Sequence, residues 1–195
     1  MVKTRIAVLV SGGGTNLQAL LDAQAAGKIP HGEIVLVVSN KEGAFALTRA
    51  EKAGVNTAVI TGKNFEARLM EVLRSNGIQM IVLAGFMKIL SGGFTSQWPD
   101  RILNIHPALI PSFCGEGYYG LRVHEEALRY GVKVTGATVH FVNEIPDGGR
   151  IIAQKAVEVQ EGDTPEVLQR RVMEQAEWIL LPQATETVAR MYCTE

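Results

Sequence analysis

Short aliphatic runs alternate with helix-like segments through the first half of the chain, and this alternation limits the possible fold more than any other feature. The runs at 6–10, 34–38, 57–60 and 80–84 consist mainly of Val, Ile, Leu, Ala and Met. Apolar residues at helical spacing follow each of the first three runs, and a glycine closes each helical segment, at Gly27, Gly54 and Gly77. Strands this apolar are typical of a parallel sheet covered by helices on both faces. The sequence therefore predicts an α/β fold with a doubly wound, mostly parallel, Rossmann-like sheet.

The pattern changes in the second half of the chain. The segment 124–130 predicts a short helix, and the runs 134–142 and 151–159 predict an antiparallel C-terminal strand pair. Thr164 and Pro165 are typical of a helix start, and Pro182 is expected to kink or end the last helix. With 195 residues, 47% of them hydrophobic, the chain is long enough for one large core, so we expect a single domain over 1–195.

Charge and cysteine content exclude several classes of protein. The formal net charge is -1, which gives no overall attraction to nucleic acid or to an acidic membrane. No apolar run reaches the length of a membrane span, and none resembles an N-terminal leader. Cys114 and Cys193 lie far apart without metal-like spacing, so we expect a reduced, cytoplasmic protein without a metal site.

A glycine-rich loop, 11–16, separates the first predicted strand from the first helix. In this arrangement free backbone N–H groups and the helix dipole converge on one point, where an anion can bind. The loop lacks the Gly-Lys-Ser/Thr of a Walker A motif, and the last glycine of a dinucleotide fingerprint would fall at Leu17. Two interpretations stay open for the loop alone: a phosphate cradle or a tight turn.

Asn104 and His106 follow another apolar run and precede a segment with two prolines. Side chains two residues apart on a strand point the same way, so an amide and an imidazole could act on one reacting oxygen. The alternative is a structural amide and a packed histidine beside a turn. Asp147 precedes two glycines, and taken alone it is better explained by ordinary turn chemistry than by a catalytic role. The residues 85–90 are expected at the same sheet edge, as a ligand-binding wall or as core at the start of a helix.

Taken together, these stretches resemble the phosphoribosylglycinamide formyltransferase family, in the family's order and across essentially the whole chain. The matching segments are 11–16 (SGGGTN), 83–90 (LAGFMKIL), 103–107 (LNIHP), 139–142 (VHFV), 147–149 (DGG) and the region of Glu177. The resemblance implies the formyltransferase fold, with a phosphate and ribonucleotide site in the N-terminal half, a folate site in the C-terminal half and catalytic residues between them. It also implies transfer of a formyl group from 10-formyltetrahydrofolate, as co-substrate and without a metal, to the amine of glycinamide ribonucleotide in purine (IMP) biosynthesis.

The resemblance also implies a role for individual residues. The catalytic residues are Asn104, His106 and Asp147, with the Asp147 carboxylate expected to raise the pKa of His106 and favour its charged form. The substrate phosphate and ribose are bound by Gly14, Thr15, Asn16, Leu17, Gln18 and Glu177. The folate is bound by Met87, Lys88, Ile89, Leu90, Asn104, Asn143, Glu144, Ile145, Pro146 and Asp147. The family also implies a cis peptide at Ile110-Pro111. The partners are these small molecules alone, and the protein is a monomer or a homodimer.

The chain departs from the family in two places. The segment after Ile60 is shorter than in many relatives, which carry a folate-binding arginine there that Lys63 or Arg68 could replace. The stretch 114–123 is longer, so its loop over the substrate side is expected to differ. His124 aligns with a family histidine near the site, and a helix-capping or structural role fits it equally well.

Other readings compete with this one. Methionyl-tRNA formyltransferases, sugar-amine formyltransferases and the formyl-folate deformylase share an Asn-x-His and a distant Asp, but each has an added domain for which this chain leaves no room. A Rossmann-like nucleotide-binding module would need an acidic residue where the second strand is followed by Asn40 and Lys41.

Overall fold

A seven-stranded sheet forms the centre of the protein, within the residues 2–194 that the computed structural model describes. Its strands are β1 (Thr4–Val10), β2 (Gly32–Ser39), β3 (Asn56–Val59), β4 (Met80–Leu83), β5 (Ile102–His106), β6 (Val134–Phe141) and β7 (Ile151–Glu158). They lie in the order β3-β2-β1-β4-β5-β6-β7. The first five run parallel, β6 is antiparallel to β5, and β7 is antiparallel to β6. The predicted mostly parallel sheet with an antiparallel C-terminal pair is confirmed.

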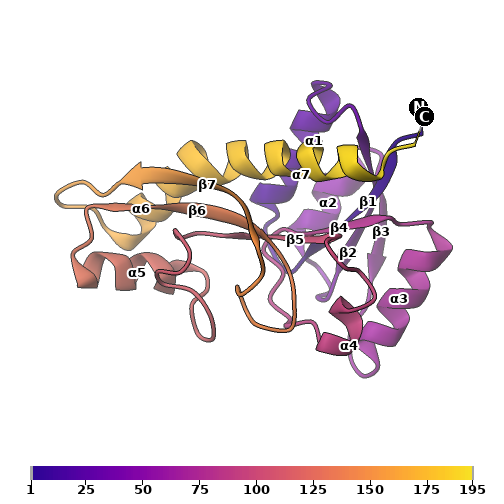
Figure 1. The fold of residues 1–195 in the computed structure, drawn as a ribbon, viewed down its shortest axis with the longest axis horizontal. Helices are drawn as coiled ribbons and strands as arrows, with labels where there is room; N and C mark the ends of the chain where they lie inside the picture. Colours follow the sequence, from indigo (N-terminus) through magenta and orange to yellow (C-terminus); the bar gives the residue numbers. More distant parts are fainter. Residues whose placement is uncertain (1, 195) are drawn as a thin grey trace.

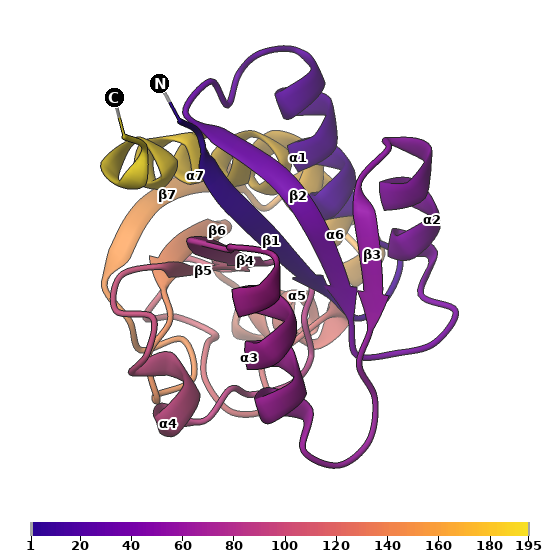
Figure 2. The same ribbon diagram turned by 90° about the vertical axis from the view of Figure 1, so that its right-hand side faces the viewer.

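Helices cover both faces of this sheet, as Figures 1 and 2 show. They are α1 (Thr15–Ala25), α2 (Phe45–Lys52), α3 (Phe65–Ser75), α4 (Gly92–Thr95), α5 (Leu121–Tyr130), α6 (Pro165–Val172), the π-helix η1 (Met173–Glu177) and α7 (Trp178–Tyr192). Buried residues of α1, α2, α6, η1 and α7 belong to one core cluster, and those of α3 and α4 belong to another. The helix α5 packs against α6 beside the antiparallel strands.

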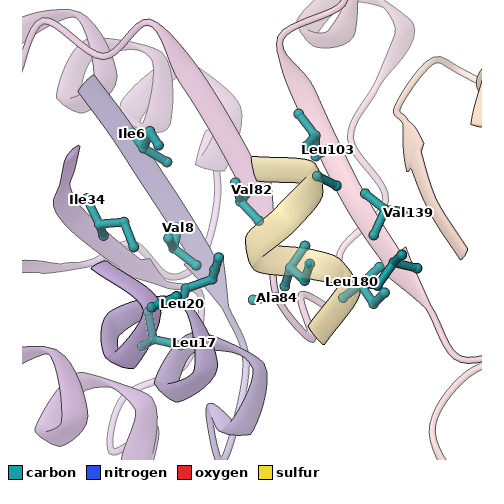
Figure 3. Packing of buried hydrophobic residues seen from close by; sticks show 14 of the residues in the cluster. Ile6, Val8, Leu17, Leu20, Ile34, Val82, Ala84, Leu103, Val139 and Leu180 are labelled. Carbon is teal, nitrogen blue, oxygen red and sulfur yellow. The ribbon is translucent and has the colours of Figure 1, made fainter. Parts of the chain in front are cut away.

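The two core clusters explain why the strands are so apolar. Along β1, Ile6 and Val8 belong to the cluster on the α1 and α7 face, whereas Ala7 and Leu9 belong to the cluster under α3. Figure 3 shows the first of these clusters, with side chains from the strands and from α1 and α7 packed together. Successive strand residues point to opposite faces, so every position must be apolar when both faces are covered. Full burial of each large aliphatic side chain contributes roughly 1.5–3 kcal/mol.

The topology brings several loops together at the carboxyl ends of the parallel strands. The chain continues from β1 to its neighbour on one side, β2, and later enters β4 on the other side, so the order reverses between β1 and β4. Ligands in open α/β sheets bind at such a reversal point. The glycine loop follows β1, the segment 84–90 follows β4, and β5 ends at His106. All three therefore meet at one edge of the sheet.

The last helix corrects the sequence-based expectation for Pro182. The sequence predicts a kink or an end at this proline; it lies inside α7, which continues to Tyr192, so of these two outcomes the end is wrong. A proline removes one backbone hydrogen bond and crowds the carbonyl four residues earlier. The apolar face of α7, which includes Leu181 and Val188, is buried on the sheet and outweighs that cost. The irregular turn lies earlier, in η1.

Four further observations complete the description of the fold. The segment 85–90 does not begin a helix, because the next helix is the short α4, capped by the Ser91 hydroxyl. The Ile110-Pro111 peptide is cis, as the family resemblance implies. Val2 and Thr194 pair in an isolated antiparallel bridge, which brings the two ends of the described chain together. No helix within residues 2–194 has the length and apolar character needed to cross a membrane.

Candidate active site

The end of β5 carries Asn104 and His106 on one face of the sheet. Leu103 and Ile105 point into the core under α7, so the residues that alternate with them face the opposite side. Both Asn104 and His106 approach Asp147, which confirms that they point the same way. The sequence-predicted trio is therefore one cluster in space.

Asp147 is held between two histidines by the loop that follows β6. Its Oδ2 lies 3.5 Å from His106 Nδ1 and accepts a hydrogen bond from the Gly115 N–H at 2.9 Å. Its Oδ1 lies 3.5 Å from His140 Nε2 and 3.4 Å from Asn104 Nδ2. Its φ of 55° places it in the left-handed region that aspartate tolerates in turns. Burial raises the pKa of Asp147, but the His140 contact, the His106 charge and the Gly115 N–H lower it more, so the net pKa is depressed.

His106 faces an acceptor at each ring nitrogen. Nε2 lies 2.8 Å from the Phe113 carbonyl, which can only accept, so Nε2 carries the proton of a neutral ring and Nδ1 faces Asp147. Burial lowers the pKa of His106, and this outweighs the raising effects of Asp147 and of the Phe113 carbonyl. Asp147 thus raises the histidine pKa as predicted, but the expected net increase is wrong because the ring is only 4% exposed.

His140 is a member of the cluster to which the sequence assigned no role. It lies directly opposite Asn104 in the antiparallel register of β5 and β6. Its Nδ1 lies 2.8 Å from the Phe141 carbonyl, so in the neutral ring Nε2 can accept from the Asn104 amide at 3.1 Å. The sequence placed this histidine in a predicted strand and in the family segment 139–142, but the strand register that brings it to Asn104 was not predictable.

The loop after β5 closes over the same cluster. Phe113 has a φ of 48° and presents its carbonyl to His106, and Gly115 presents its N–H to Asp147. The Phe113 ring packs against Tyr118 and Tyr130, with ring centroids 6.4 Å and 6.0 Å away. Gly115, within the stretch 114–123 that is expected to be longer than in the family, therefore contacts Asp147, and the preceding Phe113 contacts His106.

His124 lies behind His106 on α5. It is fully buried, and neither ring nitrogen has a hydrogen-bond partner among the described residues. Burial, with a smaller effect of His106, lowers the pKa of His124 to about 4. The N-cap of α5 is Gly120, without a side-chain cap, so His124 does not cap the helix. The ring is a neutral, buried neighbour of the site.

The glycine loop lies against the start of α2. Gly14 has a φ of 73°, and a Cβ built there would lie 2.6 Å from the Ala46 Cβ, so only glycine fits. Leu17, one of the predicted binding residues, is fully buried, which leaves its backbone alone available to a ligand. Gln18 accepts a hydrogen bond from Arg49 Nη1 at 3.0 Å and donates one to Asp22 Oδ1 at 2.9 Å. Thr15, the first residue of α1, is exposed.

Glu177 lies beside this loop, at the end of η1. It is 6% exposed, and its Oε2 accepts a hydrogen bond from Asn16 Nδ2 at 2.7 Å. Burial raises the pKa of Glu177 to about 7, although the Asn16 bond opposes the shift. The structure therefore brings together Asn16 and Glu177, two predicted ribonucleotide residues from opposite ends of the chain.

The predicted folate residues form two segments that approach one another. Met87, Ile89 and Ile145 are 48%, 71% and 58% exposed, unusually high for such side chains. Leu90 is core, at 4% exposed, so for this residue the core interpretation is correct. A Cβ built on Gly92, just after the first segment, would lie 3.3 Å from the Glu144 Cβ in the second. The remaining members, Lys88, Asn143 and Pro146, lie in these same loops.

Lys63 and Arg68 are the residues expected to replace a folate-binding arginine of the family. Among the described residues, neither makes a hydrogen bond to these two loops. Arg68 is exposed and donates to the Thr61 carbonyl at 3.0 Å, and Lys63 is exposed. The Lys88 ammonium instead lies 5.1 Å from the centroid of the Phe65 ring.

Cys114 and Cys193 are both free thiols. Within residues 2–194 no cluster of three His, Cys, Asp or Glu side chains could hold a metal ion.

Comparisons with known proteins agree with this arrangement. The formyl transferase family model matches residues 4–185. The chain is 44% identical to the phosphoribosylglycinamide formyltransferase of Haemophilus influenzae, over 88% of this chain and 81% of that protein. It is 48% identical to the trifunctional purine biosynthetic protein adenosine-3 of Gallus gallus over 96% of this chain, but it spans only 18% of that protein. The glycinamide ribonucleotide transformylase 1 structure from Symbiobacterium toebii superposes with a TM-score of 0.89 at 42% identity, covering 97% of this chain and 89% of that one.

Proposed function

Because the chain belongs to the formyl transferase family, we propose that it transfers the formyl group of 10-formyltetrahydrofolate to the amine of glycinamide ribonucleotide. The products are the N-formyl ribonucleotide and tetrahydrofolate, and the step belongs to purine biosynthesis. The observation that carries the proposal is the convergence of Asn104, His106 and Asp147 at the carboxyl end of β5. The names of the similar proteins support the choice of substrates.

Asn104 is the proposed donor to the developing oxyanion. The substrate amine attacks the formyl carbon, and the carbonyl oxygen becomes negative in the tetrahedral intermediate. The Asn104 amide nitrogen carries two N–H groups and contacts His140 and Asp147 at 3.1 Å and 3.4 Å in the free site. His140 orients the amide by accepting one N–H, and the formyl oxygen accepts the other in place of the longer contact to Asp147. Such a donor stabilises the transition state because it is fixed before charge develops.

His106 is the proposed proton carrier. Its lowered pKa keeps the ring neutral at neutral pH, with the proton on Nε2 toward Phe113 and a free lone pair on Nδ1. Nδ1 accepts the proton that the attacking nitrogen loses, directly or through an ordered water. The same proton then passes to the folate nitrogen as the carbon–nitrogen bond breaks, so the enzyme returns to its starting state.

Asp147 is proposed to stabilise the charged form of that ring. Its depressed pKa keeps it a carboxylate, 3.5 Å from Nδ1. The imidazolium that forms during transfer then has one acceptor at each nitrogen, the Asp147 carboxylate and the Phe113 carbonyl. Burial favours the neutral form of the His106 ring and Asp147 favours its charged form, so the ring can both accept and release a proton.

Residues of the glycine loop and η1 are proposed to bind the ribonucleotide. The phosphate lies at the start of α1, where Gly14 to Gln18 present backbone N–H groups and the positive end of the helix dipole. The ribose hydroxyls donate to Glu177, which Asn16 already holds. The exposed apolar side chains of 87–90 and 143–147 line the folate pocket. The backbone groups of these segments hydrogen-bond to the pteridine ring and fix its orientation.

For the protein as a whole we propose one formyltransferase domain over 1–195, acting in the cytoplasm as a monomer or homodimer. Its partners are the two small-molecule substrates, and no metal is required. Light scattering of the purified protein measures the oligomeric state.

The proposed function is tested by mixing the purified protein with 10-formyltetrahydrofolate and glycinamide ribonucleotide and following the formyl-folate absorbance. A matched reaction omits the ribonucleotide. Turnover that requires both substrates supports the proposal. Formyl loss without the ribonucleotide identifies a deformylase, and no turnover in either reaction contradicts formyl transfer to this amine.

A further inference from the structure

The helix α2 holds two consecutive carbonyls of the glycine loop. The Ala46 N–H donates to the Gly12 carbonyl at 3.0 Å, and Arg49 Nε donates to the Gly13 carbonyl at 2.8 Å. The C=O and N–H of one trans peptide point in opposite directions. The N–H groups of Gly13 and Gly14 are therefore turned away from α2, and neither donates to another backbone group within residues 2–194. Successive N–H groups that face one side form an anion-binding concavity.

The first two glycines of the loop are not crowded by other residues. A Cβ built on Gly12 or Gly13 would meet no atom within 4 Å. On the opposite side, Gly14 packs so closely on Ala46 that the loop and helix cannot separate without losing that contact. The loop is thus fixed on one side by α2 and is uncrowded at Gly12 and Gly13.

Arg49 brings a positive charge to this position without a carboxylate partner. Its side chain is half-buried, Nη1 donates to Gln18 Oε1 at 3.0 Å, and the guanidinium carbon lies 5.0 Å from the centroid of the Phe45 ring. None of the ion pairs in the described chain includes Arg49. The acidic group linked to it is Asp22, through the Gln18 amide. A bound anion can therefore supply the missing countercharge.

We infer that Arg49 is a positioning residue for the substrate phosphate: it holds the Gly13 carbonyl so that the Gly13 and Gly14 N–H groups face the phosphate, and it adds positive charge behind them. The inference rests on the proposed function, because it concerns the same phosphate subsite. A hydrogen bond to a charged group contributes enough to change an equilibrium about 10- to 100-fold. Arg49→Ala should raise the KM for the ribonucleotide by about that factor.

The test compares Arg49→Ala, Arg49→Lys and the control Lys52→Ala in the full chain. Lys52 is an exposed cation on the last turn of the same helix, so its loss matches the charge change without touching the loop. The KM for each substrate and kcat are measured with the ribonucleotide and with its phosphate-free analogue. The unfolding temperature is measured for each variant, with and without inorganic phosphate.

The expected result is a raised ribonucleotide KM in Arg49→Ala, partial recovery in Arg49→Lys, and unchanged kcat and formyl-folate KM. The phosphate-free analogue should react equally well with the wild-type protein and Arg49→Ala. Equal losses with both amine substrates, or a wild-type KM in Arg49→Ala, would overturn the inference while leaving the proposed reaction intact.

The phosphate-dependent unfolding temperature separates the two proposals if the wild-type protein fails to turn over. A rise in the wild-type protein and in Lys52→Ala, but not in Arg49→Ala, supports the Arg49 role even when the proposed function has failed. The same rise in all three proteins, or no rise in any, rejects it.

Discussion

Replacing Glu177 by Gln should make the protein more stable at alkaline pH, because the wild-type carboxyl is buried where its charge is disfavoured. Burial raises the pKa of this group from 4.5 to about 7. The folded state therefore holds a proton that the unfolded state releases between these two values. Stability is highest below the unfolded pKa and falls as the pH rises toward 7. The difference of about 2.5 units corresponds to about 3 kcal/mol of lost stability above this range.

Glutamine has the same shape and cannot ionise, so it removes this pH-dependent loss. Its side-chain oxygen can still accept the Asn16 amide, which the carboxylate accepts at 2.7 Å. Urea unfolding measures the free energies of unfolding of both proteins. The advantage of Glu177→Gln over the wild type should grow by about 2.5 kcal/mol between about pH 5 and about pH 8.

The matched control is Glu161→Gln, which removes a carboxylate from an exposed loop position. Its effect on the free energy of unfolding should be nearly the same at both pH values. If the Glu177→Gln difference were also independent of pH, the assignment of a raised pKa to Glu177 would be refuted. The proposed ribose contact adds a cost in function, a ribonucleotide KM raised about 10- to 100-fold.

The other predictions concern the catalytic cluster and the glycine loop. Asn104→Ala and His106→Ala should each lower kcat at least about 100-fold, measured as formyl transfer by protein with an unchanged melting temperature; near-normal turnover contradicts their roles. Asp147→Asn should lower the pKa of His106 further, because it removes the charge that raises it, and an unaltered histidine titration by NMR would exclude this route. Gly14→Ala should destabilise the protein by about 1–3 kcal/mol in urea unfolding, because the new Cβ strains a positive φ and meets Ala46; wild-type stability would count against this packing.

The fold was largely predictable because a sheet covered on both faces leaves few choices at each strand position. The residues 6–10 and 80–84 are apolar on both alternations, and the structure buries them in opposite core clusters. Pro182 was the exception. The expectation for Pro182 considered only the one backbone hydrogen bond that a proline removes. The burial of the whole apolar face of α7 outweighs that loss, and the helix continues past the proline.

The candidate site was predictable only where the position of a side chain follows from its own strand or loop. Asn104 and His106 share a face through strand alternation alone, whereas the His140 position depends on the register between β5 and β6. The net pKa direction of His106 also required the structure, because burial and the Asp147 charge act in opposite directions. The sequence alone contains no measure of burial at a single ring.

The most direct test of the proposed reaction follows the formyl carbon itself. The wild-type protein is given 10-formyltetrahydrofolate with an isotope-labelled formyl group, together with glycinamide ribonucleotide, and the products are examined by NMR. The account predicts that the label appears in the formyl amide of the ribonucleotide, and that His106→Ala slows its appearance at least about 100-fold. Label recovered as free formate, or equal transfer by the variant, would contradict it.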